Sequence, residues 1–197
     1  MNYREQLENL IADNNGILVT REVEKQGIPR HYLTLLSREG MLDRASHGVY
    51  VTPDAFEDEM YMLQVKSPKL VFSHETALFF HDLTDRDPLE WSVTVPCGYN
   101  ATKLRDSGIQ VHSVKKSLHL MGTTEVDTLF GRRVTAYNKE RTICDIIRNR
   151  NNMDIAILND ALKRYLSSKD KNISLLMKYA KELRVQKILR SYMEILL

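Results

Sequence analysis

The sequence predicts an α+β protein of two domains, residues 1–53 and 54–197, and three patterns lead to this prediction. Two short helical patterns separated by a glycine come early in the chain and are followed by a hairpin pattern. Apolar and polar residues then alternate, as they do in strands, over residues 90–96, 109–114 and 133–137. From residue 138 onward the apolar residues recur at helical spacing. We therefore expect a small sheet followed by a helical end.

The N-terminal domain begins with two helical segments. Residues 3–14 form the first expected helix, whose apolar side consists of Tyr3, Leu7, Leu10 and Ile11. After three apolar residues, Thr20 is expected to cap a short second helix in which Val23 points inward. Both helices are expected to pack against Leu33 and Leu36 of a third helix, which gives a three-helix core.

A glycine and a proline mark the start of that third helix. Gly27 suits a sharp turn because glycine adopts positive φ without strain. Pro29 is tolerated in a first helical turn, and the helix is expected to run to about Glu39. Residues 42–50 predict a hairpin with a three-residue loop at Ser46-His47-Gly48. Helix, turn, helix and hairpin in this order indicate a winged helix-turn-helix, a fold of DNA-binding proteins.

The third helix is the expected recognition helix. Its inner face is assigned to Tyr32, Leu33, Leu35 and Leu36, and the opposite face is polar. Arginine can pair with guanine in a major groove, and small hydroxyl groups can contact either strand. Basic side chains of the second helix and the hairpin are expected to reach phosphates or a minor groove. The candidate DNA-binding residues are therefore Arg21, Lys25, Arg30, His31, Thr34, Ser37, Arg38, Arg44 and His47.

The charge distribution leaves an alternative open. Residues 1–52 carry six Lys/Arg and seven Asp/Glu, so the candidate DNA-binding domain is close to neutral. Residues 146–197 carry eleven Lys/Arg and five Asp/Glu, which places the basic excess at the other end of the chain. Because winged helices also serve as protein-interaction modules, a domain that binds a protein partner is the alternative to a domain that binds double-stranded DNA.

The second domain is expected to alternate between helices and strands. Besides the three strands above, residues 118–121 could form a short strand, and Ser73 is expected to cap a helix that runs to His81. The other expected helices cover residues 53–67, 138–149, 154–166, 172–184 and 185–197. Their inward residues include Ile155, Leu158, Leu162 and Leu166 in one helix and Ile188, Leu189, Tyr192, Ile195 and Leu196 in the last.

Composition narrows the class of protein. The 197 residues are 43% hydrophobic and 27% charged, values that are ordinary for a globular protein. No apolar run approaches the ~20 residues that cross a membrane, and no secretion signal opens the chain. We therefore expect a cytoplasmic protein with no membrane contact, in which Cys97 and Cys144 are reduced thiols.

Patterns of catalytic and metal sites are not found in the sequence. His74 and His81 are two helical turns apart, which is too far for one metal ion. The carboxylates Asp82, Asp85 and Asp87 fit a turn, and no metal-dependent nuclease pattern follows them. A nucleophile elbow and a glycine-rich phosphate loop are also missing. We expect no metal, no cofactor and no enzymatic activity.

Two charged patterns in the second domain have structural as well as functional interpretations. Asn138 can cap a helix in which Arg141 pairs with Asp145, worth about 0.2–0.5 kcal/mol if the pair is exposed. Capping and pairing explain the charges of this stretch, in which the candidate motif is Glu140, Arg141, Thr142 and Asp145, without any function. Near the C-terminus, Lys178, Lys181 and Arg184 recur at helical spacing and form a basic stripe. The stripe is either a solvated surface or an auxiliary face for an anionic partner.

Three segments give the chain a family resemblance. They are SHGVYVTP (residues 46–53) in the winged helix, SHETAL (residues 73–78), and AYNKERTICDIIR (residues 136–148). Together with the order of the elements around them, these segments resemble the AbiEi family over nearly the full length of the chain. AbiEi proteins are the antitoxins of the AbiE abortive-infection toxin–antitoxin systems, which act in phage defence.

The resemblance implies a bifunctional protein. Members of the family bind inverted repeats in their own promoter through the winged helix and repress the operon. Their C-terminal domain counteracts a nucleotidyltransferase-like toxin, AbiEii, without a stable complex. Glu140, Arg141, Thr142 and Asp145 match the family's motif, whose role is left open. Two copies are needed on an inverted repeat, and they could meet on the DNA. A transcriptional regulator without antitoxin activity is the alternative.

Overall fold

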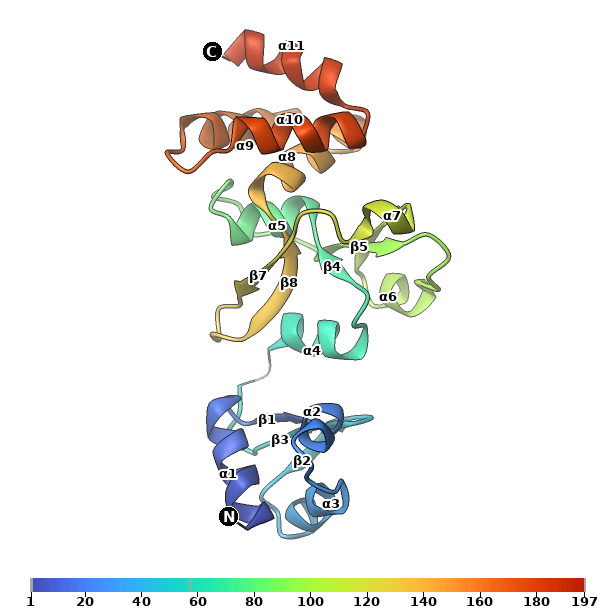
Figure 1. Ribbon diagram of the computed structural model, residues 1–197, viewed down its shortest axis with the longest axis vertical. Coiled ribbons are helices and arrows are strands. Elements are labelled where there is room, and N and C mark those ends of the chain that lie inside the picture. The colour runs from blue at the N-terminus through green and yellow to red at the C-terminus, as the bar shows by residue number, and fades with distance from the viewer. Residues whose placement is uncertain (1, 57, 197) are drawn as a thin grey trace. The chain divides into compact units, whose positions relative to one another are not determined.

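The computed structural model describes residues 2–56 and 58–196, and the side chains of Ile195 and Leu196 lie outside the described part. The chain forms two compact units (Figure 1). The first unit comprises residues 1–65 together with residues 129–132, and the second comprises residues 66–128 and 133–197. Each unit combines helices with a small sheet, so the predicted α+β fold class is confirmed. The predicted division at residue 53 into two functional domains stays a prediction.

The first unit contains four helices and a three-stranded antiparallel sheet with the strand order β1-β3-β2. Its elements are α1 (Tyr3–Asp13), β1 (Ile17–Val19), α2 (Thr20–Lys25), α3 (His31–Arg38), β2 (Asp43–Ser46), β3 (Val49–Val51) and α4 (Glu59–Lys66). Strand β1 was not predicted. It pairs antiparallel with β3, with Leu18 opposite Tyr50. Helix α2 begins directly after it, so the residue at the N-cap position is Val19, and Thr20, which was predicted to cap the helix, is its first residue.

The core of this unit joins α1, α2 and α3 to the sheet. Its buried residues are Leu7, Leu18, Val23, Ile28, Leu33, Leu36 and Leu42. The predicted three-helix packing is present, but two apolar residues were assigned wrongly to the inner faces. Tyr3 is 40% exposed and Leu35 is 45% exposed, because Leu7 and Leu33 occupy the positions of α1 and α3 that face the core.

The hairpin of the first unit differs in detail from the prediction. Ser46 pairs directly with Val49, so the loop has two residues, His47 and Gly48, and not three. The extra residue lies in the strand, where the register shifts between Arg44 and Ser46 and forms a bulge. Gly48 has a φ of +74°, which is the backbone conformation for which glycine was expected here.

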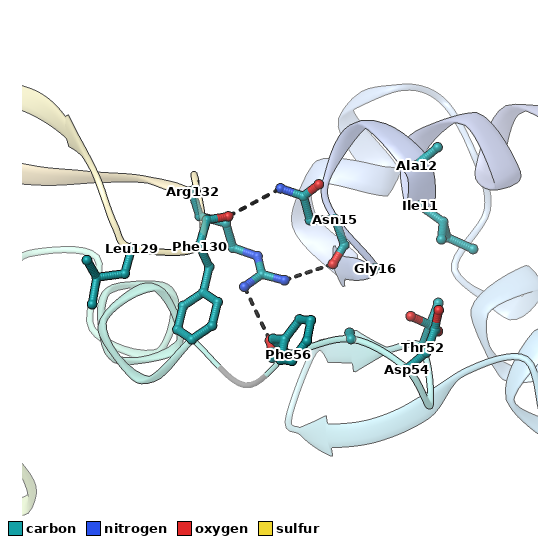
Figure 2. A pocket seen from close by; sticks show the side chains of 11 residues that line it. Ile11, Ala12, Asn15, Gly16, Thr52, Asp54, Phe56, Leu129, Phe130 and Arg132 are labelled. Carbon is teal, nitrogen blue, oxygen red and sulfur yellow. Dashed lines mark hydrogen bonds between the residues drawn. The ribbon is translucent and has the colours of Figure 1, made fainter.

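The helix predicted over residues 53–67 begins later, at Glu59. Asp58 starts it, because its side-chain Oδ1 accepts a hydrogen bond of 3.0 Å from the backbone N–H of Tyr61. Residues ahead of it are held by Arg132, which donates from Nη2 to the Asn15 carbonyl at 2.8 Å and from Nη1 to the Phe56 carbonyl at 3.3 Å. Figure 2 shows these bonds beside a cavity of about 570 Å³ in this unit.

The second unit is built on a mixed five-stranded sheet with the order β6-β5-β4-β8-β7. The strands are β4 (Val71–Phe72), β5 (Ser92–Pro96), β6 (Gln110–Val114), β7 (Thr123–Asp127) and β8 (Arg133–Tyr137). The strands predicted at residues 90–96, 109–114 and 133–137 are confirmed. Residues 118–121 do not form a strand, since Leu118 lies in a short helix, and the strand follows at β7 instead.

Helices pack around this sheet and on one another (Figure 1). They are α5 (His74–Phe80), α6 (Thr102–Asp106), α7 (Lys116–His119), α8 (Lys139–Arg148), the 3-10 turn η1 (Arg150–Asn152), α9 (Ile155–Ser167), α10 (Ile173–Glu182) and α11 (Gln186–Leu196). Helix α8 contacts α5, α9, α10 and α11, so it is the centre of the apolar core. Ile155, predicted to point inward, is 53% exposed because it lies in the first turn of α9, ahead of the packed Leu158 and Leu162.

Both cysteines are free, with Cys97 exposed and Cys144 buried. Among the residues that the structure describes, no helix has both the length and the apolar character that crossing a membrane requires.

Candidate functional site

Helix α3, the predicted recognition helix, presents a polar face to the surface. Leu33 and Leu36 are buried in the core of the first unit and fix the orientation of the helix. The side chains on the other face are exposed apart from half-buried Ser37, and they are Arg30, His31, Thr34 and Arg38. Gly27, with a φ of +78°, closes the turn between α2 and α3, and Ile28 anchors that turn in the core. Arg30 precedes α3, so the helix begins two residues after Pro29.

An aromatic contact orders the start of α3. The His31 ring lies 4.3 Å from the Tyr32 ring, measured between centroids, and Tyr32 lies 5.3 Å from Tyr3 of α1. The exposed Tyr3 therefore supports the first turn of the recognition helix. His31 is exposed, so its ring is able to hydrogen-bond to a phosphate or a base edge.

The wing carries a second pair of candidate residues. Arg44 is exposed on β2 and His47 is exposed in the two-residue turn, and Arg44 Nη2 lies 3.2 Å from His47 Nδ1. A neutral His47 that accepts this hydrogen bond through Nδ1 leaves Nε2–H and the rest of the guanidinium directed to solvent. The two side chains then act as one cluster of donors at the tip of the hairpin.

The basic side chains of the first unit differ in how they are paired. Arg4 forms ion pairs with Glu8 at 3.3 Å and Glu39 at 3.1 Å. Arg132 lies 3.6 Å from Asp58. Among the described residues, no carboxylate lies within ion-pair distance of the remaining five basic side chains, Arg21, Lys25, Arg30, Arg38 and Arg44. Residues 1–52 are close to neutral in total, yet their unpaired cations all belong to the candidate DNA-binding set.

The second candidate set, Glu140, Arg141, Thr142 and Asp145, lies inside the second unit. All four residues are buried, and Arg141 is 0% exposed. The capping role predicted for Asn138 is confirmed, since its Oδ1 accepts a 3.0 Å hydrogen bond from the Arg141 backbone N–H. The i, i+4 pair of Arg141 and Asp145 is present as well. It lies in the core, so the energy expected for an exposed pair does not apply to it.

Arg141 has partners on several sides. Its Nε donates to both carboxylate oxygens of Asp145, at 3.1 and 3.0 Å. Its Nη1 donates to the carbonyls of Leu118 and Met121, at 2.8 and 3.0 Å. The guanidinium carbon lies 4.2 Å from the centre of the Tyr137 ring, a cation–π contact. The arginine therefore ties α8 to β8, to α7 and to the segment after α7.

The other motif residues also bind within the unit. Glu140 Oε1 accepts hydrogen bonds from the Tyr165 hydroxyl at 3.0 Å and from the Asn172 backbone N–H at 3.2 Å. Thr142 donates to the Tyr137 carbonyl at 3.3 Å. Burial raises the pKa of Asp145 to about 6, against the opposing effect of Arg141. These contacts join α8, α9 and the start of α10 through polar groups in a mostly apolar core.

The basic stripe of the C-terminal region is shorter than predicted. Lys178 and Lys181 are exposed on α10. Arg184 is exposed too, but α10 ends at Glu182, and Arg184 has a φ of +60°. Its Cα–Cβ direction therefore no longer follows the helical repeat that the spacing implied. The residues share a region of the surface without forming one helical stripe.

His74 and His81 lie at opposite ends of α5. His81 ends the helix, and its Nε2 lies 2.6 Å from the Tyr137 carbonyl, while His74 is buried at the other end. The described residues contain no group of three or more His, Cys, Asp or Glu side chains placed to hold a metal ion. His112 and Arg148 lie near His74, on β6 and α8, and neither was among the candidate residues. Spacing along the chain gives no signal for residues that only the sheet and α8 bring together.

Comparison with known proteins bears on the first unit. The family model described as "Transcriptional regulator, AbiEi antitoxin" matches residues 5–53. After this match, residues 5–53 are called the AbiEi domain below. The predicted family resemblance is thereby confirmed over this AbiEi domain, which contains all nine candidate DNA-binding residues. The family that the AbiEi domain matches is described by two roles, transcriptional regulator and antitoxin.

Two further comparisons concern the chain as a whole. The crystal structure of the RV2827C protein from Mycobacterium tuberculosis has a similar fold, with a TM-score of 0.56 and 13% sequence identity. The similarity covers 91% of this chain and 71% of that one. It extends beyond the AbiEi domain and shows that the two proteins share a fold. The comparison with curated proteins finds no match.

Proposed function

We propose that the protein is a DNA-binding transcriptional repressor and antitoxin, which binds inverted repeats in the promoter of its own operon through the AbiEi domain. The observation that carries this proposal is the set of unpaired, exposed cations on α2, α3 and the wing, within the segment that the family model matches. Two copies would bind one inverted repeat, and we propose that they meet on the DNA.

Each surface of the domain has a distinct part in the proposal. Arg30, Thr34 and Arg38 read base edges from the major groove, where an arginine can form two hydrogen bonds to guanine. His31 and Ser37 support the same face. Arg21 and Lys25 contact phosphates from α2, and Arg44 and His47 contact phosphates or the minor groove from the wing. Position along the DNA and choice of sequence are thus assigned to different side chains.

The second activity that we propose is antitoxicity against a nucleotidyltransferase-like toxin, located in residues 54–197 and exerted without a stable complex. The family resemblance supports it, and the fold similarity of the whole chain agrees with a second structured part next to the AbiEi domain. We assign Glu140, Arg141, Thr142 and Asp145 to holding that part together, since each is buried and hydrogen-bonded within it.

A gel-shift assay on the inverted repeat upstream of the gene tests the DNA-binding proposal. We expect the triple variant Arg30→Ala, Thr34→Ala, Arg38→Ala to lose sequence-specific binding and to keep weak, salt-sensitive binding. A matched control replaces Arg4, whose charge is already paired with Glu8 and Glu39. Affinity of the triple variant equal to that of the wild type would refute the groove assignment.

Co-expression with the toxin separates the two activities. The triple variant is expected to protect cells from the toxin while repression of a promoter reporter is lost. Loss of protection together with repression, in a variant that is still folded, would place antitoxicity in the recognition face and contradict the proposed division. A stoichiometric complex with the toxin on size exclusion would favour the protein-interaction alternative.

A further inference from the structure

A polar cavity lies within the second unit, and neither DNA binding nor repression uses it. Its volume is about 190 Å³, and its walls come from α5, β5, β6 and α8. The rings of His74 of α5 and His112 of β6 are stacked in its lining, with centroids 3.5 Å apart and an interplanar angle of 16°. Arg141, Asp145 and Arg148 line the cavity from successive turns of α8.

The cavity contains hydrogen-bond donors that the fold does not use. Arg141 spends Nε and Nη1 on Asp145 and two carbonyls, and among the described residues its Nη2 has no hydrogen-bond partner. His112 Nε2 is buried and also lacks a partner within the described part of the chain. Arg148 is exposed and adds a second guanidinium. A buried donor without an acceptor is costly, and His112 Nε2 is such a donor, so a ligand with acceptor oxygens would stabilise it.

The charges of the lining favour an anion. Two guanidinium groups face one carboxylate, and both oxygens of that carboxylate are already bound by Arg141 Nε. Burial lowers the pKa of His112, and burial together with His112 and the two arginines lowers the pKa of His74 well below its usual range. The histidines are therefore neutral at pH 7, and a neutral His112 can donate from Nε2. The cavity carries a net charge of about +1.

We propose that this cavity binds a phosphoryl group, held by Arg141 Nη2, Arg148 and His112 Nε2. These donors come from α8 and from β6, so they approach from different directions, which suits the three oxygen acceptors of a tetrahedral phosphate monoester better than a planar carboxylate. The volume is below that of pockets for drug-sized ligands, which matches one phosphate with little else enclosed. The phosphate is carried by a free small molecule or by the 5′ end of a nucleic acid.

Isothermal titration of the full-length protein with inorganic phosphate tests the proposal. Arg148→Gln is the informative variant, because the side chain is exposed and its loss leaves the core intact. The control is Arg105→Gln, which removes the same charge from an exposed position of α6 outside the cavity. We expect Arg148→Gln to weaken phosphate binding about tenfold or more and Arg105→Gln to leave it unchanged.

A second measurement locates the ion directly. In ring ¹H–¹⁵N spectra, phosphate is expected to shift the His112 Nε2 resonance, which the variant His112→Gln identifies by its loss. Equal weakening by Arg148→Gln and Arg105→Gln, an unmoved His112 resonance, or no binding of phosphate by the wild type would each overturn the proposal. Operator binding, measured separately by gel shift, does not depend on this result.

Paired ligands distinguish the two sources of phosphate. Adenosine 5′-monophosphate is compared with adenosine, and a single-stranded oligonucleotide with a 5′-phosphate is compared with its 5′-hydroxyl twin. A preference for the phosphate in the first pair alone supports a small-molecule ligand. A preference in the second pair supports the end of a nucleic acid, since the rest of that strand would lie outside the cavity. No preference in either pair would count against the phosphoryl assignment.

Discussion

The outward face of α3 and the buried motif of α8 contain similar residues and have opposite surroundings. Arg38 is exposed, and among the described residues it has no ion-pair partner. Arg141 is 0% exposed and donates to a carboxylate and two carbonyls while its guanidinium lies on the Tyr137 ring. An arginine is a candidate functional residue in both of these segments. The whole guanidinium of Arg38 is open to a partner outside the protein, whereas Arg141 has only Nη2 left for one.

The difference follows from the cost of burying a charge. A guanidinium that leaves water loses its hydrogen bonds to water and must replace them with bonds to groups of the protein. The surroundings of Arg141 provide such groups. Gly122 is part of that arrangement. Its φ is +78°, and a Cβ on it would lie 2.8 Å from the Arg141 Cβ. The segment between α7 and β7 thus closes tightly over the arginine, as expected of a structural group.

The largest expected effect is on stability. Arg141→Ala should lower the unfolding free energy of the second unit by about 3–5 kcal/mol, because it leaves the buried Asp145 carboxylate without its partner. Trp91, the one tryptophan of the sequence, lies in this unit and reports its denaturant unfolding by fluorescence. The control Arg105→Ala should change the value by less than ~0.5 kcal/mol. An Arg141→Ala protein as stable as this control would show that the pair does not hold the fold.

A glycine comparison tests the same packing with a smaller change. Gly122→Ala should cost about 2–3 kcal/mol, since it combines positive-φ strain with a clash against Arg141. Gly108 has nearly the same φ, +76°, and nothing within 4 Å of an added Cβ. Gly108→Ala should therefore cost only the backbone term, about 1 kcal/mol. Equal losses in the two variants, measured by denaturant unfolding, would mean that the Arg141 contact contributes nothing.

Binding free energies at the recognition face are expected to be smaller. Arg30→Ala should cost about 1–3 kcal/mol against one particular base pair of the operator and little against a sequence that lacks it. Arg21→Ala should weaken all sequences alike and reduce the slope of log affinity against log salt by about 0.9. Gel shifts on single-base operator variants at several salt concentrations separate these behaviours. A uniform loss for Arg30→Ala would reassign that residue to phosphate contact.

Prediction from the sequence succeeded where local patterns determine the structure. Helices with a capping residue and helical spacing, such as α8 after Asn138 and α9 after Asp154, were placed within one or two residues. Strands β1 and β4 were missed because each has three residues or fewer, too short for an alternating pattern to be recognised. The segment at residues 118–121 was misassigned for a related reason, since four residues do not distinguish a helical turn from a strand.

The candidate sites show a further limit. The exposed face of α3 follows from helical periodicity once its buried residues are known, so Arg30, His31, Thr34 and Arg38 could be named in advance. Burial of the α8 motif depends on how α8 lies among four other helices, which the spacing of its charges does not contain. The pairing of His74 with His112 depends on the contact of α5 with β6 and had no signal in the sequence at all.

The smallest expected effect separates a surface charge from a binding residue. Lys178 and Lys181 are exposed like Arg38, but they lie on α10, outside the segment that the family model matches. If the two lysines are only solvated surface charges, the double variant Lys178→Gln, Lys181→Gln should change operator affinity less than twofold and leave the salt slope unaltered. If both touch flanking phosphates, the slope should fall by about 1.8. We expect the first result, because Arg184 leaves the helical repeat and breaks the stripe that tracking a DNA backbone would require.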